Sequence, residues 1–397
     1  MQFWHKNIDG VHAFYINGLL RSLFMSLTTI FIPVYIYSLG IKAFGLVSYA
    51  IMAVAIFFIV QRALIVFLVF PLSKIIERIG FRKSITWSVV FLMISTVSLL
   101  LAQNNILYLW VATGAMGLNI PLYWISRDSA LSQDIEGSRM GTKMGYVTVL
   151  ENIAGLLGPF AGGAMVALFG YSSLFVFSLA ILGLSTIPLY WMPPHMHKNG
   201  VSLAGFWYFL KDNRYLHQAV ANFGSAMNDY GNGIIWPLIL FIQGFNSENL
   251  GTVYSLVAIV TIGVQYLSGK WFDRLRARED YADEGVFGIA SFGIAITWLV
   301  RLFGQGIRQI VPIDMSRQLF SSIHANFYAD YLHLGGKRMG SIAFWVYAEV
   351  VYSLGAIFIF SLMVLGVYLD IWKELVIGTL ALWSLVTIVI ARESNMR

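Results

Sequence analysis

The sequence of 397 residues is 58% hydrophobic and 12% charged, with a net charge of +6 and no cysteine. A soluble domain carries roughly 25% charged residues, so half that share over a whole chain excludes an ordinary soluble protein and indicates that lipid is the solvent. The lack of cysteine excludes disulfides and cysteine-ligated metals. The basic residues sit between apolar stretches, which argues against a nucleic-acid partner.

Apolar stretches long enough to cross a bilayer follow one another along the chain. About 20 residues of helix cross a hydrocarbon core of about 30 Å, and the backbone there must satisfy its own hydrogen bonds. The sequence therefore predicts an all-α membrane protein with twelve transmembrane helices. We expect them near residues 12–38, 44–73, 83–103, 105–127, 141–169, 172–192, 215–243, 249–272, 284–304, 307–331, 338–366 and 371–392.

Lysine and arginine gather in alternate loops between these helices. With both termini in the cytoplasm, five basic clusters fall on the inner side, at residues 74–83, 139–143, 198–214, 270–278 and 337–338. The opposite loops keep little beyond Lys42, Arg308 and Lys373. Because cytoplasmic loops carry an excess of Lys and Arg, we expect a multi-pass protein of the cytoplasmic (inner or plasma) membrane.

The charged stretch "SKIIERIGFRK" lies between the second and third predicted helices. It resembles the loop between helices two and three of the major facilitator superfamily, whose pattern is Gly-x-x-x-Asp-Arg-x-Gly-Arg-Arg/Lys. Ser73 stands at the first glycine of that pattern and Glu77 at the aspartate. The matching positions are Arg78, Gly80, Arg82 and Lys83.

The fifth predicted helix, "GYVTVLENIAGLLGPFAGGAM", resembles the helix-five signature of exporters in that family, especially drug–proton antiporters. The matching residues are Gly145, Gly158, Pro159, Gly162 and Gly163. Small residues at this spacing let helices approach closely, and proline permits a bend, so plain packing is the alternative explanation. Trp110 stands where proton-linked exporters often carry an arginine in helix four, which weakens the antiporter resemblance.

A linker at 193–214 divides the chain into halves, 1–192 and 215–397. Pro193 and Pro194 end the sixth helix, and a short amphipathic cytoplasmic helix is expected after them. Three segments recur in order in both halves: "IFIPVYIYSLG" and "IIWPLILFIQG", "SKIIERIGFRK" and "GKWFDRLRAR", "SRMG" and "KRMG". Internal repeats with a site at their interface are typical of secondary transporters. The resemblance likewise implies two pseudo-symmetric six-helix halves that rock against each other.

In the family, the acid of the signature loop and its basic neighbours bridge helices and hold the cytoplasmic face shut in one state. The resemblance implies that this gate is formed by Glu77, Arg78, Gly80, Arg82, Asp273 and Arg274. The alternative is that these charges only set the topology and form scattered ion pairs.

Polar and charged residues also occur inside the predicted spans. A charge at mid-membrane costs at least about 2.5–3.5 kcal/mol, so such residues normally face partners or a wet cavity. The candidates for substrate binding or proton coupling are Asn17, Arg21, Arg62, Tyr123, Glu151, Asn222, Asp229, Asp314, Arg317 and Glu349. Of these, Asp314 and Arg317 could simply pair with each other, and Arg62 could pair with Glu151 or another acid.

Arg21, Asp229 and Glu349 have no obvious partner on their own helices, which favours a functional role. An acid exposed alternately to the two sides of a membrane can load and release a proton. We expect Asp229 or Glu349 to do so, opposed by Arg21. The chain has neither a phosphate-binding Gly-x4-Gly-Lys-Ser/Thr motif nor a His-Glu-x-x-His motif, so no ATP-driven step, metal or cofactor is expected.

These features together predict a monomeric secondary transporter, not an enzyme, embedded in the lipid bilayer. The first choice of function is export of a small or amphipathic organic molecule, driven by inward flow of protons. The runner-up is proton-coupled import of a nutrient or organic anion, with Arg21 and Arg317 as anion ligands. A non-transporting membrane receptor or assembly partner is the alternative of another class.

Overall fold

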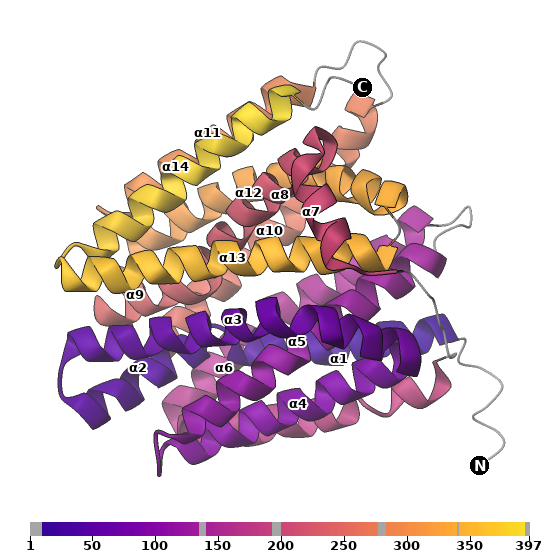
Figure 1. Ribbon diagram of the computed structural model, residues 1–397. Coiled ribbons are helices and arrows are strands. Elements are labelled where there is room, and N and C mark those ends of the chain that lie inside the picture. The colour runs from indigo at the N-terminus through magenta and orange to yellow at the C-terminus, as the bar shows by residue number, and fades with distance from the viewer. Residues whose placement is uncertain (1–9, 135–139, 193–199, 277–282, 340, 394–397) are drawn as a thin grey trace.

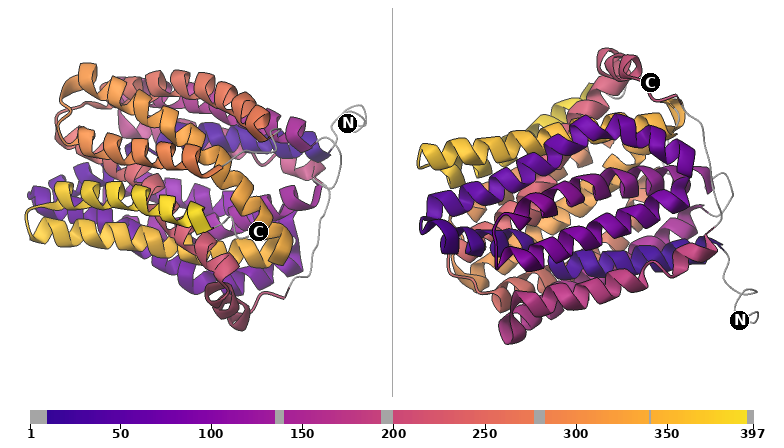
Figure 2. Two further views of the ribbon diagram at one scale, coloured as in Figure 1. Left: turned by 90° about the horizontal axis from the view of Figure 1, so that it is seen from above. Right: turned by 60° about the horizontal axis from the view of Figure 1, so that its bottom comes forward.

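The computed structural model describes the backbone of residues 10–134, 140–192, 200–276, 283–339 and 341–393. Some side chains within these ranges are not described, chiefly those at 130–152, 269–285 and 325–341. Within these ranges every regular element is helical, and the long helices run side by side (Figure 1). In Figure 1 the first half (indigo to magenta) lies below the second half (orange to yellow), and in the right-hand view of Figure 2, with the bottom brought forward, the first half lies in front.

Six spans precede the linker. They are formed by α1 (Gly10–Thr28) with α2 (Phe31–Phe44), by α3 (Val47–Ile79), α4 (Phe81–Ala102) and α5 (Tyr108–Asp134), and by α6 (Met140–Leu184) with the 3₁₀ turn η1 (Pro188–Trp191). α6 contains the fifth and sixth spans, because its backbone turns at Gly170, where φ is 78°. Glycine adopts a positive φ without the steric cost that a Cβ would add.

Six more spans follow the predicted linker helix, α7 (Leu203–Lys211). They are α8 (Asn213–Tyr230) with the π-helical turn η2 (Gly231–Ile235) and α9 (Trp236–Ile242), then α10 (Ser247–Arg276), α11 (Asp283–Arg301), α12 (Gly306–Met339), α13 (Ser341–Tyr368) and α14 (Trp372–Glu393). The prediction of twelve spans is confirmed. Most bounds differ from the expected ones by a few residues, but the first span and the spans formed by α3, α5 and α12 end further along the chain than predicted.

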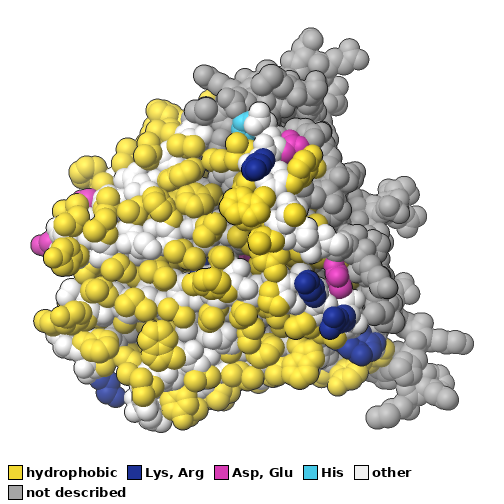
Figure 3. Space-filling model, viewed as in Figure 1, with side chains coloured by type: hydrophobic (Ala, Val, Ile, Leu, Met, Phe, Trp, Pro, Cys, Tyr) yellow, Lys and Arg dark blue, Asp and Glu magenta, His cyan; other side chains and the backbone are white. Residues whose placement is uncertain are grey.

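The outer surface fits a lipid environment. Figure 3 shows a face covered mostly by hydrophobic side chains, with charged side chains toward the two ends of the helices. Large apolar side chains such as Phe67 and Phe303 are 76% and 79% exposed, which would be costly in water but not in hydrocarbon. Six segments of the described chain are long and apolar enough to cross a membrane on those grounds alone.

The structure corrects one local prediction, because "SKIIERIGFRK" is not a loop. Only Gly80 separates α3 from α4, with φ 81° and ψ 163°, and its backbone N–H donates to the carbonyl of Ile76. Glu77 and Arg78 therefore lie in the last turn of α3, and Arg82 lies in the first turn of α4. Glycine makes this single-residue turn possible.

The two halves meet through α3 against α13, α6 against α10, and α2 against α9. The α6–α10 contact is unusually close. A Cβ on Gly163 would lie 2.6 Å from the carbonyl oxygen of Ser247, and one on Gly251 would lie 2.3 Å from the carbonyl oxygen of Pro159. Only residues without a side chain allow this approach.

The remaining small residues of the fifth span pack within the first half. A Cβ on Gly158 would collide with Ser26 of α1, and one on Gly162 would lie 2.5 Å from the carbonyl oxygen of Leu27. The Ser26 hydroxyl also donates to the carbonyl of Ala154, at 2.5 Å. The glycines of the pattern therefore allow α6 to pack closely against α1 on one side and against α10 on the other. The surroundings of Gly145 lie outside the described residues.

The linker helix α7 is fixed to the start of α13 by one tyrosine. The hydroxyl of Tyr347 donates to the backbone carbonyl of Ser202, at 2.9 Å, and accepts from the backbone N–H of the same residue, at 3.2 Å. Phe206 and Phe209 of α7 are buried in an apolar cluster with Tyr347 and Phe344. Ser202 caps α7 by accepting from the N–H of Gly205.

Candidate functional site

Arg21 is buried in the first half, with 4% of its surface exposed. Its Nη2 donates to Oδ1 of Asn119 on α5, at 2.8 Å, and its guanidinium carbon lies 3.5 Å from the ring centroid of Tyr123 on the same helix. Nη1 is buried and has no hydrogen-bond partner within the described part of the chain. One turn earlier, Asn17 donates to the carbonyl of Ser185, at 2.7 Å. Arg21 is thus oriented by two neighbours while one N–H edge stays unused.

Arg62 of α3 reaches across to the second half. Its Nη1 lies 2.7 Å from Oε1 of Glu349 on α13 and 3.3 Å from Oγ of Ser353. Its Nε donates to the hydroxyl of Tyr230 on α8. The side chains of Arg62 and Glu349 are only 7% and 15% exposed, so a low-dielectric ion pair joins the two halves of the protein. Glu349 is therefore the partner of Arg62, which the sequence left open between Glu151 and another acid.

Asp229 lies beside this ion pair but is not part of it. Its Oδ2 accepts from the hydroxyl of Tyr352, at 2.8 Å, and from Oγ of Ser225, at 3.5 Å. No described Lys, Arg or His lies within 4 Å of its carboxylate. Its side chain is exposed, although the residue is near the middle of the seventh span. The guanidinium carbon of Arg62 lies 5.2 Å from the ring centroid of the same Tyr352. Asp229 is therefore linked through Tyr352 to the polar interior around the ion pair.

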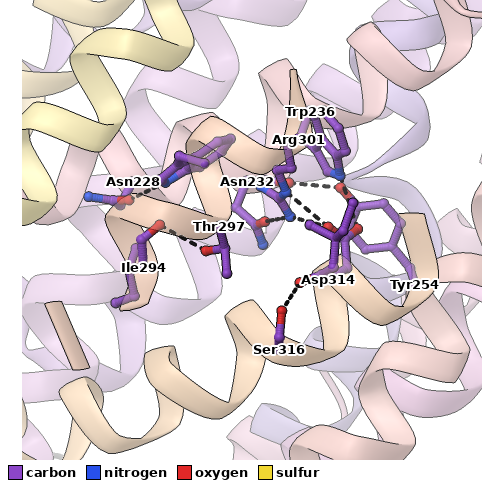
Figure 4. Close-up of polar contacts among 11 residues, drawn as sticks. Asn228, Asn232, Trp236, Tyr254, Ile294, Thr297, Arg301, Asp314 and Ser316 are labelled. Atoms are coloured by element: carbon purple, nitrogen blue, oxygen red, sulfur yellow. Dashed lines mark hydrogen bonds and ion pairs between the residues drawn. The ribbon is translucent and has the colours of Figure 1, made fainter. Parts of the chain in front are cut away.

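A second ion pair is buried wholly within the second half (Figure 4). Arg301 at the end of α11 places Nη2 2.7 Å from Oδ1 of Asp314 on α12, and the indole N–H of Trp236 donates to Oδ2, at 3.0 Å. Arg301 also donates to Oδ1 of Asn232, at 3.0 Å, and its guanidinium lies 4.4 Å from the rings of Trp236 and Trp298. Both carboxylate oxygens of Asp314 are therefore occupied.

The expected alternative that Asp314 and Arg317 pair with each other is wrong. Asp314 pairs with Arg301 instead, and no described acid lies within 4 Å of Arg317. The guanidinium of Arg317 lies over the ring of Trp298, with 5.2 Å to the centroid, and its Nε is buried without a hydrogen-bond partner in the described chain. The two residues share a helical face, but a third helix supplies the partner.

The expectation that Arg21 opposes the acids is also not met. Arg21 contacts α5, and the arginine at Glu349 is Arg62. Asn222 is buried on α8, at 4% exposure. The side chain of Glu151 lies outside the described residues.

Only part of the expected cytoplasmic gate is described. Glu77 is half-buried, and its Oε1 has no partner within the described chain. Arg78 is exposed, while Nη1 of Arg82 donates to the carbonyl of Met192, at 3.3 Å. The side chains of Asp273 and Arg274 lie outside the described residues, so the bridge to the second half stays a prediction.

Sequence reasoning missed Arg301, Asn232 and Asn119 as members of these networks. The available signal for Arg301 was its place three residues inside the predicted end of the ninth span. Asn119 stands inside the fourth span, and Asn232 follows Asp229 in "NDYGNG". A polar residue inside a span needs a partner, and this rule applied to each of them.

Across the described residues, no group of three or more His, Asp or Glu side chains is placed to hold a metal ion. The sites described above are therefore clusters of arginines, carboxylates, amides and aromatic rings. The arginines and carboxylates among them can form charge-assisted hydrogen bonds with charged organic groups, and the carboxylates can exchange protons.

Comparison with known proteins places this architecture. The sequence profile of the Major Facilitator Superfamily matches residues 14–307, and no curated protein matches the sequence. The structure is similar to a crystal structure of the POT family transporter PepTSo, with a TM-score of 0.75, 9% identity and 98% of each chain covered. It is also similar to a POT family transporter in complex with 5-aminolevulinic acid, with a TM-score of 0.71, 12% identity and coverage of 96% of this chain and 95% of that one.

At these identities the two solved structures establish the fold alone. The profile match covers most of the chain and includes the signature stretch at Gly80. The chain belongs to the Major Facilitator Superfamily, and it is a multi-pass membrane transporter of the secondary type rather than an enzyme.

Proposed function

We propose that this transporter couples substrate movement to proton flow, and that Asp229 carries the proton. The supporting observation is an exposed carboxylate near the middle of a membrane span, with no cation within 4 Å among the described residues. Glu349, the other candidate, is held by Arg62 at 2.7 Å and is 15% exposed. A proton can therefore reach Asp229 more easily than Glu349.

Tyr352 links the proton site to the ion pair between the halves. Its hydroxyl donates to Asp229, and its ring lies under the guanidinium of Arg62. Protonation of Asp229 replaces a strong charge-assisted acceptor by a neutral group, which weakens the hold on Tyr352 and changes the environment of Arg62. We propose that this loosens the Arg62–Glu349 contact and lets the halves rock.

The proposed direction is export of a small or amphipathic organic molecule, with protons flowing inward. This rests on the resemblance of the helix-five pattern, with Gly158, Pro159, Gly162 and Gly163, to that of exporters. The proposed location is the cytoplasmic membrane with both termini inside, as the Lys and Arg distribution favours. The protein is proposed to act as a monomer, with halves at 1–192 and 215–397 and a linker at 193–214.

The test is transport by purified protein in proteoliposomes, with and without an imposed pH gradient, over a panel of organic cations, anions and neutral compounds. We expect the gradient to drive net transport in the wild type. In Asp229→Asn, the side chain stays neutral and cannot bind or release a proton. Gradient-driven transport should therefore fall at least about tenfold, while substrate exchange without net proton movement persists.

The matched control is Asp370→Asn, which changes an exposed aspartate in the turn between α13 and α14. Its φ of 60° is a conformation that asparagine also tolerates, so this variant should behave like the wild type. Glu349→Gln tests the other acid. Transport that keeps its pH dependence in Asp229→Asn would refute the assignment to Asp229, and loss of that dependence in Glu349→Gln alone would assign the proton to Glu349. Accumulation with protons moving in the same direction as the substrate would establish import instead of export.

A further inference from the structure

We propose that the substrate carries an anionic group, a carboxylate or a phosphate, which Arg21 binds from the first half and Arg317 from the second. This inference rests on the proposed function in that it names the substrate class of the transporter. It does not require Asp229 to carry the proton.

The arginines inside the spans are of two kinds. Arg62 and Arg301 each have a carboxylate at 2.7 Å. Arg21 and Arg317 have none within 4 Å in the described chain, although they are only 4% and 6% exposed. A buried cation without a counter-ion is costly in a membrane protein and marks a functional site by default.

Arg21 is held as a binding group rather than as a structural brace. Asn119 accepts from Nη2 at 2.8 Å, and the ring of Tyr123 supports the guanidinium plane at 3.5 Å. Neither neighbour carries a charge that neutralises the arginine. The buried Nη1 has no partner in the described chain, so a rigid, oriented N–H donor remains for a ligand.

Arg317 is left over for a different reason. The nearest acid in sequence, Asp314, forms its ion pair with Arg301 through Oδ1 and accepts from Trp236 through Oδ2, and it does not lie within 4 Å of Arg317. Trp298 stacks on the guanidinium, and Nε stays buried without a partner among the described groups. The network around Asp314 therefore keeps the positive charge of Arg317 available.

The chemistry of the unused donors selects the ligand. A guanidinium presents paired N–H groups that fit the two oxygens of a carboxylate or a phosphate, and charge-assisted bonds of this kind are about twice as strong as neutral ones. One arginine stands on each half, so an anion that touches both would be bound at the repeat interface, where transporters of this architecture hold their substrates.

The test is direct binding to purified protein in nanodiscs, which needs no transport. The probes are succinate and glycerol 3-phosphate as anions, tetraethylammonium as a cation and glucose as a neutral compound, each up to about 10 mM, which detects affinities as weak as ~1 mM. We expect an anion to bind, and Arg21→Gln and Arg317→Gln each to weaken its binding at least about tenfold. Arg308→Gln, which changes an exposed arginine on the same helix as Arg317, should leave binding unchanged.

Stability in the absence of ligand separates binding from bracing. Arg21→Gln and Arg317→Gln remove an uncompensated charge, so neither should lower the melting temperature, whereas a structural arginine would. Unchanged anion affinity in both variants overturns the inference. So does the binding of only the cation or the neutral compound, or of no anion at all.

The two proposals fail separately. Anion binding that depends on both arginines, together with transport that ignores the pH gradient, refutes proton coupling and leaves the substrate class standing. Proton-coupled transport of a cation or a neutral compound refutes the anionic substrate and leaves proton coupling standing.

Discussion

At the scale of single residues, the membrane-embedded charges divide into those that another protein group neutralises and those that none does. Arg62 with Glu349 and Arg301 with Asp314 form the first kind. Replacing a whole buried ion pair by apolar groups is often tolerated, but removing one partner leaves a charge stranded at low dielectric. The two kinds therefore respond to mutation in opposite ways.

Asp314→Asn should destabilise the protein strongly, because it strands Arg301, which is 1% exposed. We expect a loss of about 3–5 kcal/mol in the free energy of unfolding, measured by denaturant titration in detergent micelles. The double variant Arg301→Met/Asp314→Leu should recover most of that loss. A cost of less than about 1 kcal/mol for Asp314→Asn would mean that solvent or another acceptor compensates the charge of Arg301, contrary to the geometry.

At the scale of elements, the polar spans are explained by what they face. α8 and α12 carry Asp229, Asp314 and Arg317, and these side chains meet other helices of the interior instead of lipid. The π-helical turn η2 adds to this, because Asn232 within it accepts from Arg301 through its side chain and from the hydroxyl of Tyr254 through its carbonyl, at 3.0 and 2.8 Å. Single π-helical turns frequently occur at functional sites.

The α6–α10 seam offers a test at the same scale. In Gly251→Ala the new methyl group would lie 2.3 Å from the backbone carbonyl oxygen of Pro159, which cannot move aside as a flexible side chain could. Overpacking of this kind costs typically about 1–3 kcal/mol, and the two halves should be pushed apart along the seam.

The melting temperature in detergent measures the effect of Gly251→Ala. Gly263→Ala, on the same helix, is the matched control, because a Cβ there meets nothing within 4 Å. Equal melting temperatures for the two variants would show that the seam is looser than described.

At the scale of the whole molecule, the fold was predictable from the sequence and the pairing of charges was not. A span of about 20 apolar residues identifies itself locally, and alternating Lys and Arg order the spans. The partner of Arg62, in contrast, is 287 residues away, and only the packing of α3 on α13 selects it. Helical spacing placed Asp314 near Arg317, but it could not reveal that α11 delivers Arg301 to the same carboxylate.

The end of the molecule opposite the linker helix is held together by contacts between the halves. The rings of Tyr37 on α2 and Phe241 on α9 meet edge to face, 6.1 Å apart, and the hydroxyls of Tyr171 and Ser247 lie 3.5 Å apart. If the halves rock, these contacts must open in the other state. Lys42 and Glu248, exposed near the same end on α2 and α10, are suitable positions for reporting this change.

We propose that a proton on Asp229 shifts the balance between two arrangements of the halves. The chain has no cysteine, so Lys42→Cys/Glu248→Cys can carry spin labels without further changes. The decisive measurement is the distance distribution between these labels, by double electron–electron resonance in nanodiscs, in acidic and in alkaline buffer. We expect two populations whose ratio changes with pH in this background and no longer changes when Asp229→Asn is added. A single distance at every pH, or an unchanged pH response with Asp229→Asn, would contradict it.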